Sequence, residues 1–119
     1  MSRAKRSGQG RERSKESGLW FIPCSVQPGM FKGEWLVYVF AADPTDPKKT
    51  FPVKLFADER DVTCIQGSPE RDKPAKALLR VDVANRAGGL AEVIFPQPAQ
   101  PVGESAFFDE NLLKQETGV

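Results

Sequence analysis

Hydrophobic and polar residues alternate in short runs between Leu19 and Phe108, and clusters of Gly, Pro, Asn and Asp separate these runs. The separating clusters recur about every eight to twelve residues. Alternation with a period of two is the repeat of a half-buried β-strand. Short strands at this spacing are typical of a small barrel or sandwich. The pattern therefore predicts an all-β fold.

The run Glu34–Ala41 has the strongest strand character in the chain, because it is rich in aromatic and β-branched residues. Both of its faces are apolar, with Trp35, Val37 and Val39 on one and Leu36, Tyr38 and Phe40 on the other. Two apolar faces suit a strand that is covered on both sides. We therefore expect the Tyr38 face to be either barrel interior or a binding surface.

The clearest predicted hairpin joins Leu78–Ala84 to Leu90–Phe95, because the intervening segment Asn85–Gly89 ends in a turn-forming pair of glycines. Alternation in the first run predicts an inward face of Leu79, Val81 and Val83 and an outward face of Arg80 and Asp82. Arg80 and Glu92 form an ion pair on the solvent face if the register brings them together.

Prolines limit where the remaining strands can run. Pro23 interrupts the first strand and predicts an edge position or a bulge there. The segment Ala42–Lys49 contains two Asp-Pro pairs and is predicted to be a surface loop rather than a strand. Gln66–Lys76 is predicted to be a second polar loop, and Pro96–Pro101 an extended crossing of polyproline type.

The end of the chain predicts a short strand at Glu104–Phe108 and a helical turn over Asp109–Lys114, with Asp109 as its N-cap. The segment Gly103–Leu113 resembles the end of SH3-type barrels, in which a glycine precedes a short aromatic strand and a one-turn helix. The chain lacks the paired tyrosines and the closing Pro and Tyr of signalling SH3 domains. The resemblance therefore implies barrel geometry and gives no support for binding of proline-rich peptides.

Together these patterns predict a small five- or six-stranded antiparallel barrel of SH3-like kind, with an OB-like barrel as the alternative. The barrel is expected to span residues 19–114, and residues 115–119 are expected to fray. Residues 1–18 are too polar to join a core, so a disordered tail is predicted there. No run of apolar residues is long enough for a membrane span or a secretory signal, which predicts a cytoplasmic protein with no membrane partner.

The formal charge of +1 hides an asymmetry between the tail and the barrel. Residues 1–18 contain six basic side chains against the acids Glu12 and Glu16, whereas residues 19–119 contain eleven basic against fourteen acidic ones. The basic tail residues are Arg3, Lys5, Arg6, Arg11, Arg13 and Lys15. Such a tail either is an ordinary solvated terminus or neutralises the charge of a nucleic acid or an acidic protein face.

The composition argues against catalysis. The chain has no histidine, and therefore lacks the commonest general base and the commonest metal ligand. Cys24 and Cys64 have neither a CxxC partner nor a neighbouring histidine, so we expect either buried free thiols or a disulfide between them. The acids around Arg60 are explained by a solvated turn. We predict no catalytic residue, cofactor or metal site, with an enzyme based on carboxylates or thiols as the remaining alternative.

Two kinds of binding site remain. The first is a protein-docking surface formed by Met30, Phe31, Trp35 and Tyr38, because Met and aromatic residues are enriched at interfaces. Its alternative is structural: the strand residues fill the core, and the Met30–Phe31 loop folds over the barrel mouth. The second is a single-stranded nucleic-acid site formed by the six basic tail residues together with Lys48 and Lys49. The leading hypothesis is a non-enzymatic accessory subunit that docks on a larger protein assembly; the oligomeric state stays unknown.

Overall fold

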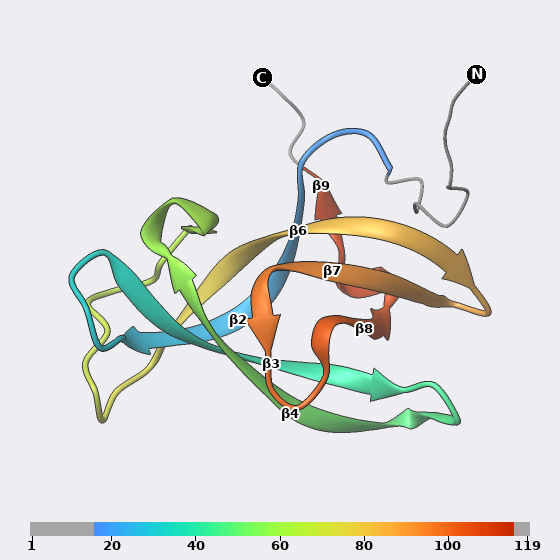
Figure 1. Ribbon diagram of the computed structural model, residues 1–119, viewed down its shortest axis with the longest axis horizontal. Coiled ribbons are helices and arrows are strands. Elements are labelled where there is room, and N and C mark those ends of the chain that lie inside the picture. The colour runs from blue at the N-terminus through green and yellow to red at the C-terminus, as the bar shows by residue number, and fades with distance from the viewer. Residues whose placement is uncertain (1–15, 116–119) are drawn as a thin grey trace, which may run out of the picture.

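The computed structural model describes residues 16–115 and contains strands and short 3-10 helices (Figure 1). The strands are β2 (Trp20–Pro28), β3 (Glu34–Asp43), β4 (Asp46–Asp58), β5 (Val62–Thr63), β6 (Ala75–Ala87), β7 (Leu90–Ala99), β8 (Gly103–Asp109) and β9 (Lys114–Gln115). The 3-10 helices are η1 (Glu59–Asp61) and η2 (Glu110–Leu112). Residues 1–15 of the predicted tail and residues 116–119 lie outside the described part of the chain.

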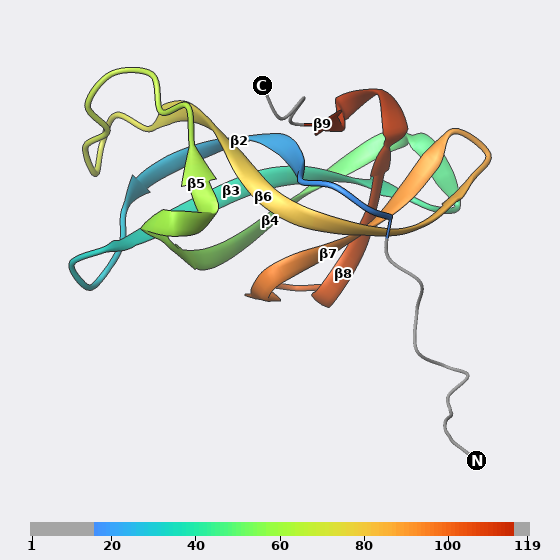
Figure 2. The same cartoon turned by 90° about the horizontal axis from the view of Figure 1, so that it is seen from above.

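Five antiparallel strands close into a barrel in the order β3, β8, β7, β6 and β2, with β2 returning to β3. Three more strands extend it, because β4 pairs with β3, β5 with β6 and β9 with β2. The prediction of a small antiparallel barrel is therefore confirmed, while the choice between the SH3-like and OB-like types stays a prediction. Seen from above, the turns of the β3–β4 and β6–β7 hairpins lie at one end of the molecule and the β2–β3 turn at the other (Figure 2).

Inward-facing side chains from every barrel strand form one core. Phe108, Ile22 and Leu79 are among its largest fully buried members. Phe108 meets Phe95 edge to face, with ring centroids 6.0 Å apart and an interplanar angle of 80°. The predicted inward face of β6 is confirmed, because Leu79, Val81 and Val83 are all buried. Period-two alternation therefore identified the core face of this strand correctly.

The predicted loop at Ala42–Lys49 is wrong, because β4 begins at Asp46 and only a tight turn separates it from β3. The carboxylate of Asp43 makes this turn. Its Oδ1 accepts hydrogen bonds from the Thr45 N–H at 2.9 Å and from Thr45 Oγ1 at 2.7 Å. The hydrogen bond from the Thr45 side chain is the main cause of a lowered pKa at Asp43. An Asp side chain that bonds two residues ahead lets the strands continue almost to the turn.

The predicted ion pair between Arg80 and Glu92 does not form, because the register places Glu92 opposite Asn85. An irregularity between Val83 and Asn85 shifts the ladder at this point. Glu92 is only 9% exposed. Its carboxylate accepts hydrogen bonds from Asn85 Nδ2 at 2.7 Å and from Ser105 Oγ at 3.1 Å. A buried carboxylate needs such donors, and these two hydrogen bonds therefore offset its loss of hydration.

The C-terminal turn is shorter than predicted, because the 3-10 helix covers only Glu110–Leu112. Asp109 is its N-cap as predicted, and its side chain accepts a hydrogen bond from the Asn111 N–H at 2.9 Å. The chain then becomes extended, and β9 pairs Gln115 with Trp20 and Lys114 with Phe21. Gln115, which the sequence assigns to a frayed end, is therefore paired with β2.

Arg86 joins the segment before β2 to the end of the β6–β7 hairpin. Its guanidinium donates to both carboxylate oxygens of Glu16, at 2.7 and 3.1 Å, and to Glu110 Oε1 at 3.2 Å. These hydrogen bonds raise the pKa of Arg86. The guanidinium carbon also lies 5.0 Å from the centroid of the Trp20 ring. Arg86 therefore fixes the point at which the N-terminal segment meets the barrel.

Candidate functional site

The β2–β3 turn is held by its own hydrogen bonds and by one to η1. The carboxylate oxygen Glu34 Oε1 accepts hydrogen bonds from the Met30 N–H at 3.0 Å and the Phe31 N–H at 3.3 Å. The Gly29 N–H donates to the Glu34 carbonyl at 3.0 Å, and the Gly33 carbonyl accepts from the Glu59 N–H at 2.9 Å. The turn is therefore preorganised rather than a loose loop.

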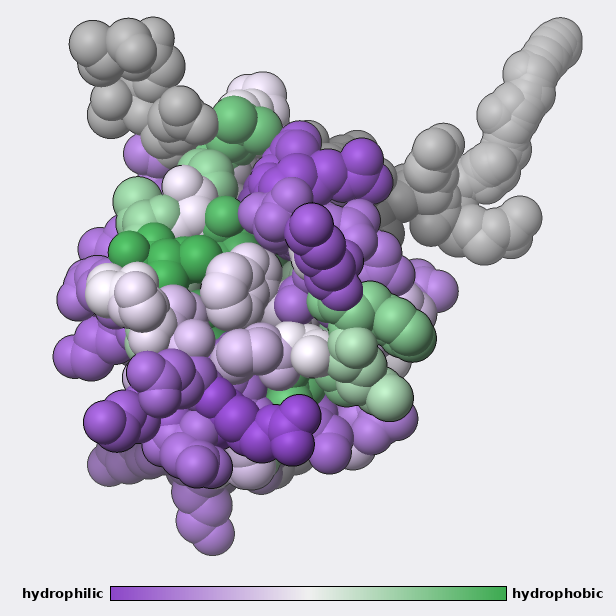
Figure 3. All heavy atoms as spheres, turned by 90° about the vertical axis from the view of Figure 1, so that its left-hand side faces the viewer, coloured by the Kyte–Doolittle hydropathy of each residue, from purple (hydrophilic) through white to green (hydrophobic). Residues whose placement is uncertain are grey.

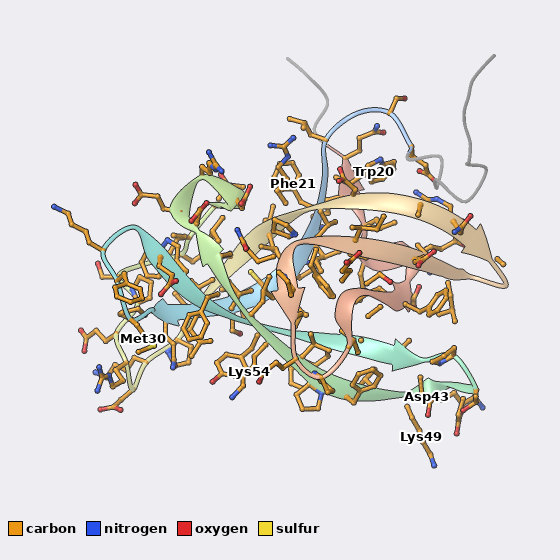
Figure 4. The ribbon with its side chains drawn as sticks, in the orientation of Figure 1. Trp20, Phe21, Met30, Asp43, Lys49 and Lys54 are labelled. Atoms are coloured by element: carbon orange, nitrogen blue, oxygen red, sulfur yellow. The ribbon has the colours of Figure 1, made fainter. Side chains whose placement is uncertain are left out.

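This turn presents two large apolar side chains to solvent. Met30 is 76% exposed and Phe31 is 71% exposed. Neither side chain folds over the barrel mouth, which was the structural alternative to a docking role. Met30 lies at the left-hand end of the molecule in Figure 4. Figure 3 views this end and shows green hydrophobic surface among purple hydrophilic side chains. A rigid turn with exposed Met and Phe side chains matches the chemistry of an interface core.

The two predicted docking residues on β3 lie on opposite faces. Trp35 is partly buried and packs against the core, so its side chain serves the interior. Tyr38 is half-buried on the other face, where Phe40 is 61% exposed. The face that carries Tyr38 is therefore the outer face of the barrel and is partly open. Sequence alternation separated the two faces but did not tell which one is interior.

The structure adds exposed hydrophobic residues that the sequence did not single out. Phe56 is exposed on β4 and lies directly opposite Leu36 of β3. Leu112 of η2 is also exposed. The pairing of Phe56 with Leu36 follows from the register of the β3–β4 hairpin, which depends on the tight turn at Asp43. Because a loop is predicted in place of this turn, the pairing of Phe56 with Leu36 could not be predicted from the sequence.

The basic residues of the nucleic-acid hypothesis do not gather around these aromatic residues. Lys49 lies near Asp43, at the end of the molecule opposite Met30 (Figure 4). Its Nζ is 3.9 Å from a carboxylate oxygen of Asp46. Lys48 is exposed beside it on β4. The six basic residues predicted in the tail lie outside the described residues, so the geometry adds no support to this hypothesis.

The acidic cluster around Arg60 forms the helix η1 and its flank. Asp58 precedes η1 and lies 3.4 Å from Arg60 in an exposed ion pair. Within residues 16–115, no group of three or more potential ligands (His, Cys, Asp or Glu) is placed to hold a metal ion. An exposed ion pair in a turn is explained by solvation and chain reversal.

The cysteines are both free but differ in environment. Cys24 is buried in β2, as expected, whereas Cys64 is exposed, which corrects the expectation of two buried thiols. Cys64 has a left-handed backbone with φ of 55° and follows β5 directly. Burial raises the pKa of the Cys24 thiol from 9.0 to about 12. A buried thiol of high pKa is a poor nucleophile.

We expect a maleimide to modify Cys64 rapidly in the folded protein and Cys24 only after unfolding. The reason is that Cys64 is exposed, whereas Cys24 is buried and burial raises the pKa of its thiol to about 12. Mass spectrometry of labelled peptides before and after denaturation measures both sites. Equal labelling of both thiols in the folded state would contradict this assignment.

Above pH 9 the Cys24 thiol ionises in the unfolded chain while it stays protonated in the folded protein. The contribution of Cys24 to the free energy of unfolding therefore declines as pH rises from 9 towards 12.

A groove with a volume of about 580 Å³ lies on the side of the barrel where Tyr38 is found. It is lined mainly by apolar side chains, which include Pro23, Tyr38, Phe40, Leu78, Phe108 and Leu112. Lys76 and Lys114 are the charged residues in its lining. The groove is within the size range of pockets that hold small ligands, about 300–1,000 Å³.

Comparison with protein-family models, curated proteins and solved structures gave no match. Across the described residues, the structure contains no helix long and apolar enough to cross a membrane.

Proposed function

We propose that this barrel is a protein-binding module that docks on a larger assembly through the β2–β3 turn, with Met30 and Phe31 as its anchors. The observation that carries the proposal is the strong exposure of both side chains on a turn fixed by Glu34. Exposing such side chains gives no stability to the barrel itself, whereas burying them against a partner is favourable.

The hydrogen bonds of Glu34 support the proposal because they reduce the entropy lost on binding. A loop that is already held in one conformation loses little freedom when a partner covers it. The outer face of β3 leads away from this turn and carries Tyr38 and Phe40. Tyr38 extends the docking surface, whereas Trp35 supports it from the interior.

A photo-reactive phenylalanine analogue placed at position 31 tests the proposal. We expect irradiation in an extract of the producing cells to cross-link it to one specific protein, because the side chain at this position is central to the interface. In competition, the unlabelled Phe31→Ala variant is expected to displace that partner about tenfold less effectively than the unmodified protein.

Position 107 provides the matched control. Phe107 is a partly exposed phenylalanine on β8 and pairs with Ala42 of β3, far from the turn. The same analogue there should not capture that partner, and Phe107→Ala should compete normally. Cross-linking at position 31 to RNA, or to no macromolecule above the level seen at position 107, would overturn the proposal.

A further inference from the structure

Two barrel strands separate along part of their length and leave a gap in the wall. β3 pairs with β2 from Trp35 to Tyr38 and with β8 only at Ala42. On the same side, β2 pairs with β3 from Ser25 to Pro28 and with β9 at Trp20 and Phe21. In the described chain this leaves Val39–Ala41 and Ile22–Cys24 without a strand partner across the gap. We call these two segments and the gap the seam.

Pro23 explains why the ladder stops. If the register of Ser25 with Tyr38 continued, Pro23 would lie opposite Phe40. Proline has no N–H to donate, so this position cannot complete the pair. Pro23 keeps its place opposite Leu78 in the ladder between β2 and β6. Figure 1 shows the result, since β2 rises towards β9 while β3 continues towards its turn with β4.

The main chain of Phe40 faces this gap. In an antiparallel strand, alternate residues direct their N–H and C=O groups to the same neighbour. The Glu34 carbonyl accepts from Gly29 of the β2 side, so the even-numbered residues of β3 face β2. The pairing with β4 gives the same orientation. Lys54 of β4 exchanges main-chain hydrogen bonds with Gln100 and therefore faces away from β3, so its partner Tyr38 faces away from β4 and towards β2. Phe40 thus offers one donor and one acceptor that no strand of the described chain pairs.

The groove described above lies along the seam and supplies the side-chain environment. Its lining includes Pro23 and Cys24 from one strand and Tyr38, Val39 and Phe40 from the other. Lys76 and Lys114 give it positive charge, and no Asp or Glu lines it. A ligand complementary to this site is an extended chain with free main-chain N–H and C=O groups, apolar side chains and negative charge.

We propose that the seam binds an extended acidic peptide of a partner protein, which pairs through its main chain with Phe40 and places apolar side chains in the groove. Carboxylates flanking the apolar residues meet Lys76 and Lys114. The seam is about 10 Å long at three residues per strand, so a peptide triplet spans it. Pairing with an open strand edge is a general mode of peptide recognition. The anchors Met30 and Phe31 do not line the groove, so either proposal can fail without the other.

The test uses the capped peptide Asp-Asp-Val-Leu-Val-Asp-Asp as the probe, titrated into isotope-labelled protein and followed by amide NMR. We expect saturable shifts at Phe40 and slower hydrogen exchange of its amide. A matched peptide that is methylated on the main-chain nitrogens of Val-Leu-Val keeps its side chains and its charge but loses the N–H groups that donate hydrogen bonds. It should bind at least about tenfold more weakly.

Charge reversal tests the rest of the site. Lys76→Glu and Lys114→Glu are each expected to raise the Kd for the probe about fivefold, because both positions are exposed and line the groove. Lys48→Glu makes the same change on β4 outside the groove and should leave the Kd unchanged, as should Phe31→Ala. No shift at Phe40 at millimolar peptide, or equal binding of the methylated peptide, would overturn the proposal.

Discussion

Replacement of Phe108 by alanine is expected to lower the free energy of unfolding by about 4 kcal/mol. Phe108 is 1% exposed and belongs to the single core cluster. Its ring also packs edge to face against Phe95, an arrangement that is lost with the ring. The cost combines lost burial with the cavity left behind, since β8 is held between β7 and β3 and has little freedom to collapse. Urea denaturation followed by tryptophan fluorescence measures the change.

Phe107 is a control within the same strand. It is the preceding residue on β8, points to the other face and is 38% exposed. We expect Phe107→Ala to cost less than about 1 kcal/mol, because much of this side chain already meets water. A similar loss in both variants would mean that the assignment of the inner face of β8 is wrong.

Gly29→Ala is expected to destabilise the protein by about 2 kcal/mol and to disturb the β2–β3 turn. A Cβ atom at this position would lie 2.8 Å from the main-chain oxygen of Glu34 and 2.8 Å from its Oε1. The main-chain oxygen cannot move without breaking the hydrogen bond that closes the turn. The carboxylate would also leave the N–H groups of Met30 and Phe31. Thermal unfolding measures the stability, and cross-linking from position 31 reports the position of the turn.

Gly67→Ala separates this clash from the general cost of replacing a glycine. Gly67 has a φ of +87°, and a Cβ there would meet nothing within 4 Å. The variant should therefore cost only about 1 kcal/mol of backbone strain and leave cross-linking from position 31 unchanged. If Gly29→Ala is as stable as the unmodified protein, the turn is not closed in the way described.

Much of the barrel could be predicted because burial on one face leaves a period of two in the sequence. The faces of β6 and the hairpin with β7 follow directly from this pattern. The pattern does not encode the register, which depends on turn geometry and on irregularities of the ladder. The Asp43 turn is of this kind and accounts for the misplaced loop, and the hairpin turn that follows Ala87 sets a register in which Arg80 and Glu92 lie far apart.

The candidate site was only partly predictable for a related reason. Met30 and Phe31 stand out in a glycine-flanked turn, and the structure exposes both. In β3, however, both faces are apolar, and no local signal tells that Trp35 points inward while Phe40 is exposed. The sequence marked Pro23 as an edge or bulge, but the open seam becomes visible only when the strand opposite it is known. The point at which two neighbouring strands stop pairing is known only from the topology and register of the sheet.

The outer edge of the β3–β4 hairpin bears on how the protein behaves at high concentration. Since Lys54 directs its main chain to this edge, the alternate residue Pro52 also faces it and has no N–H to offer. The Lys54 groups are already taken by Gln100, and exposed Lys48 and Lys49 add charge nearby. A strand from another molecule therefore finds few free main-chain hydrogen-bonding groups along this part of the β4 edge. Fibril growth by addition of strands to this edge is disfavoured.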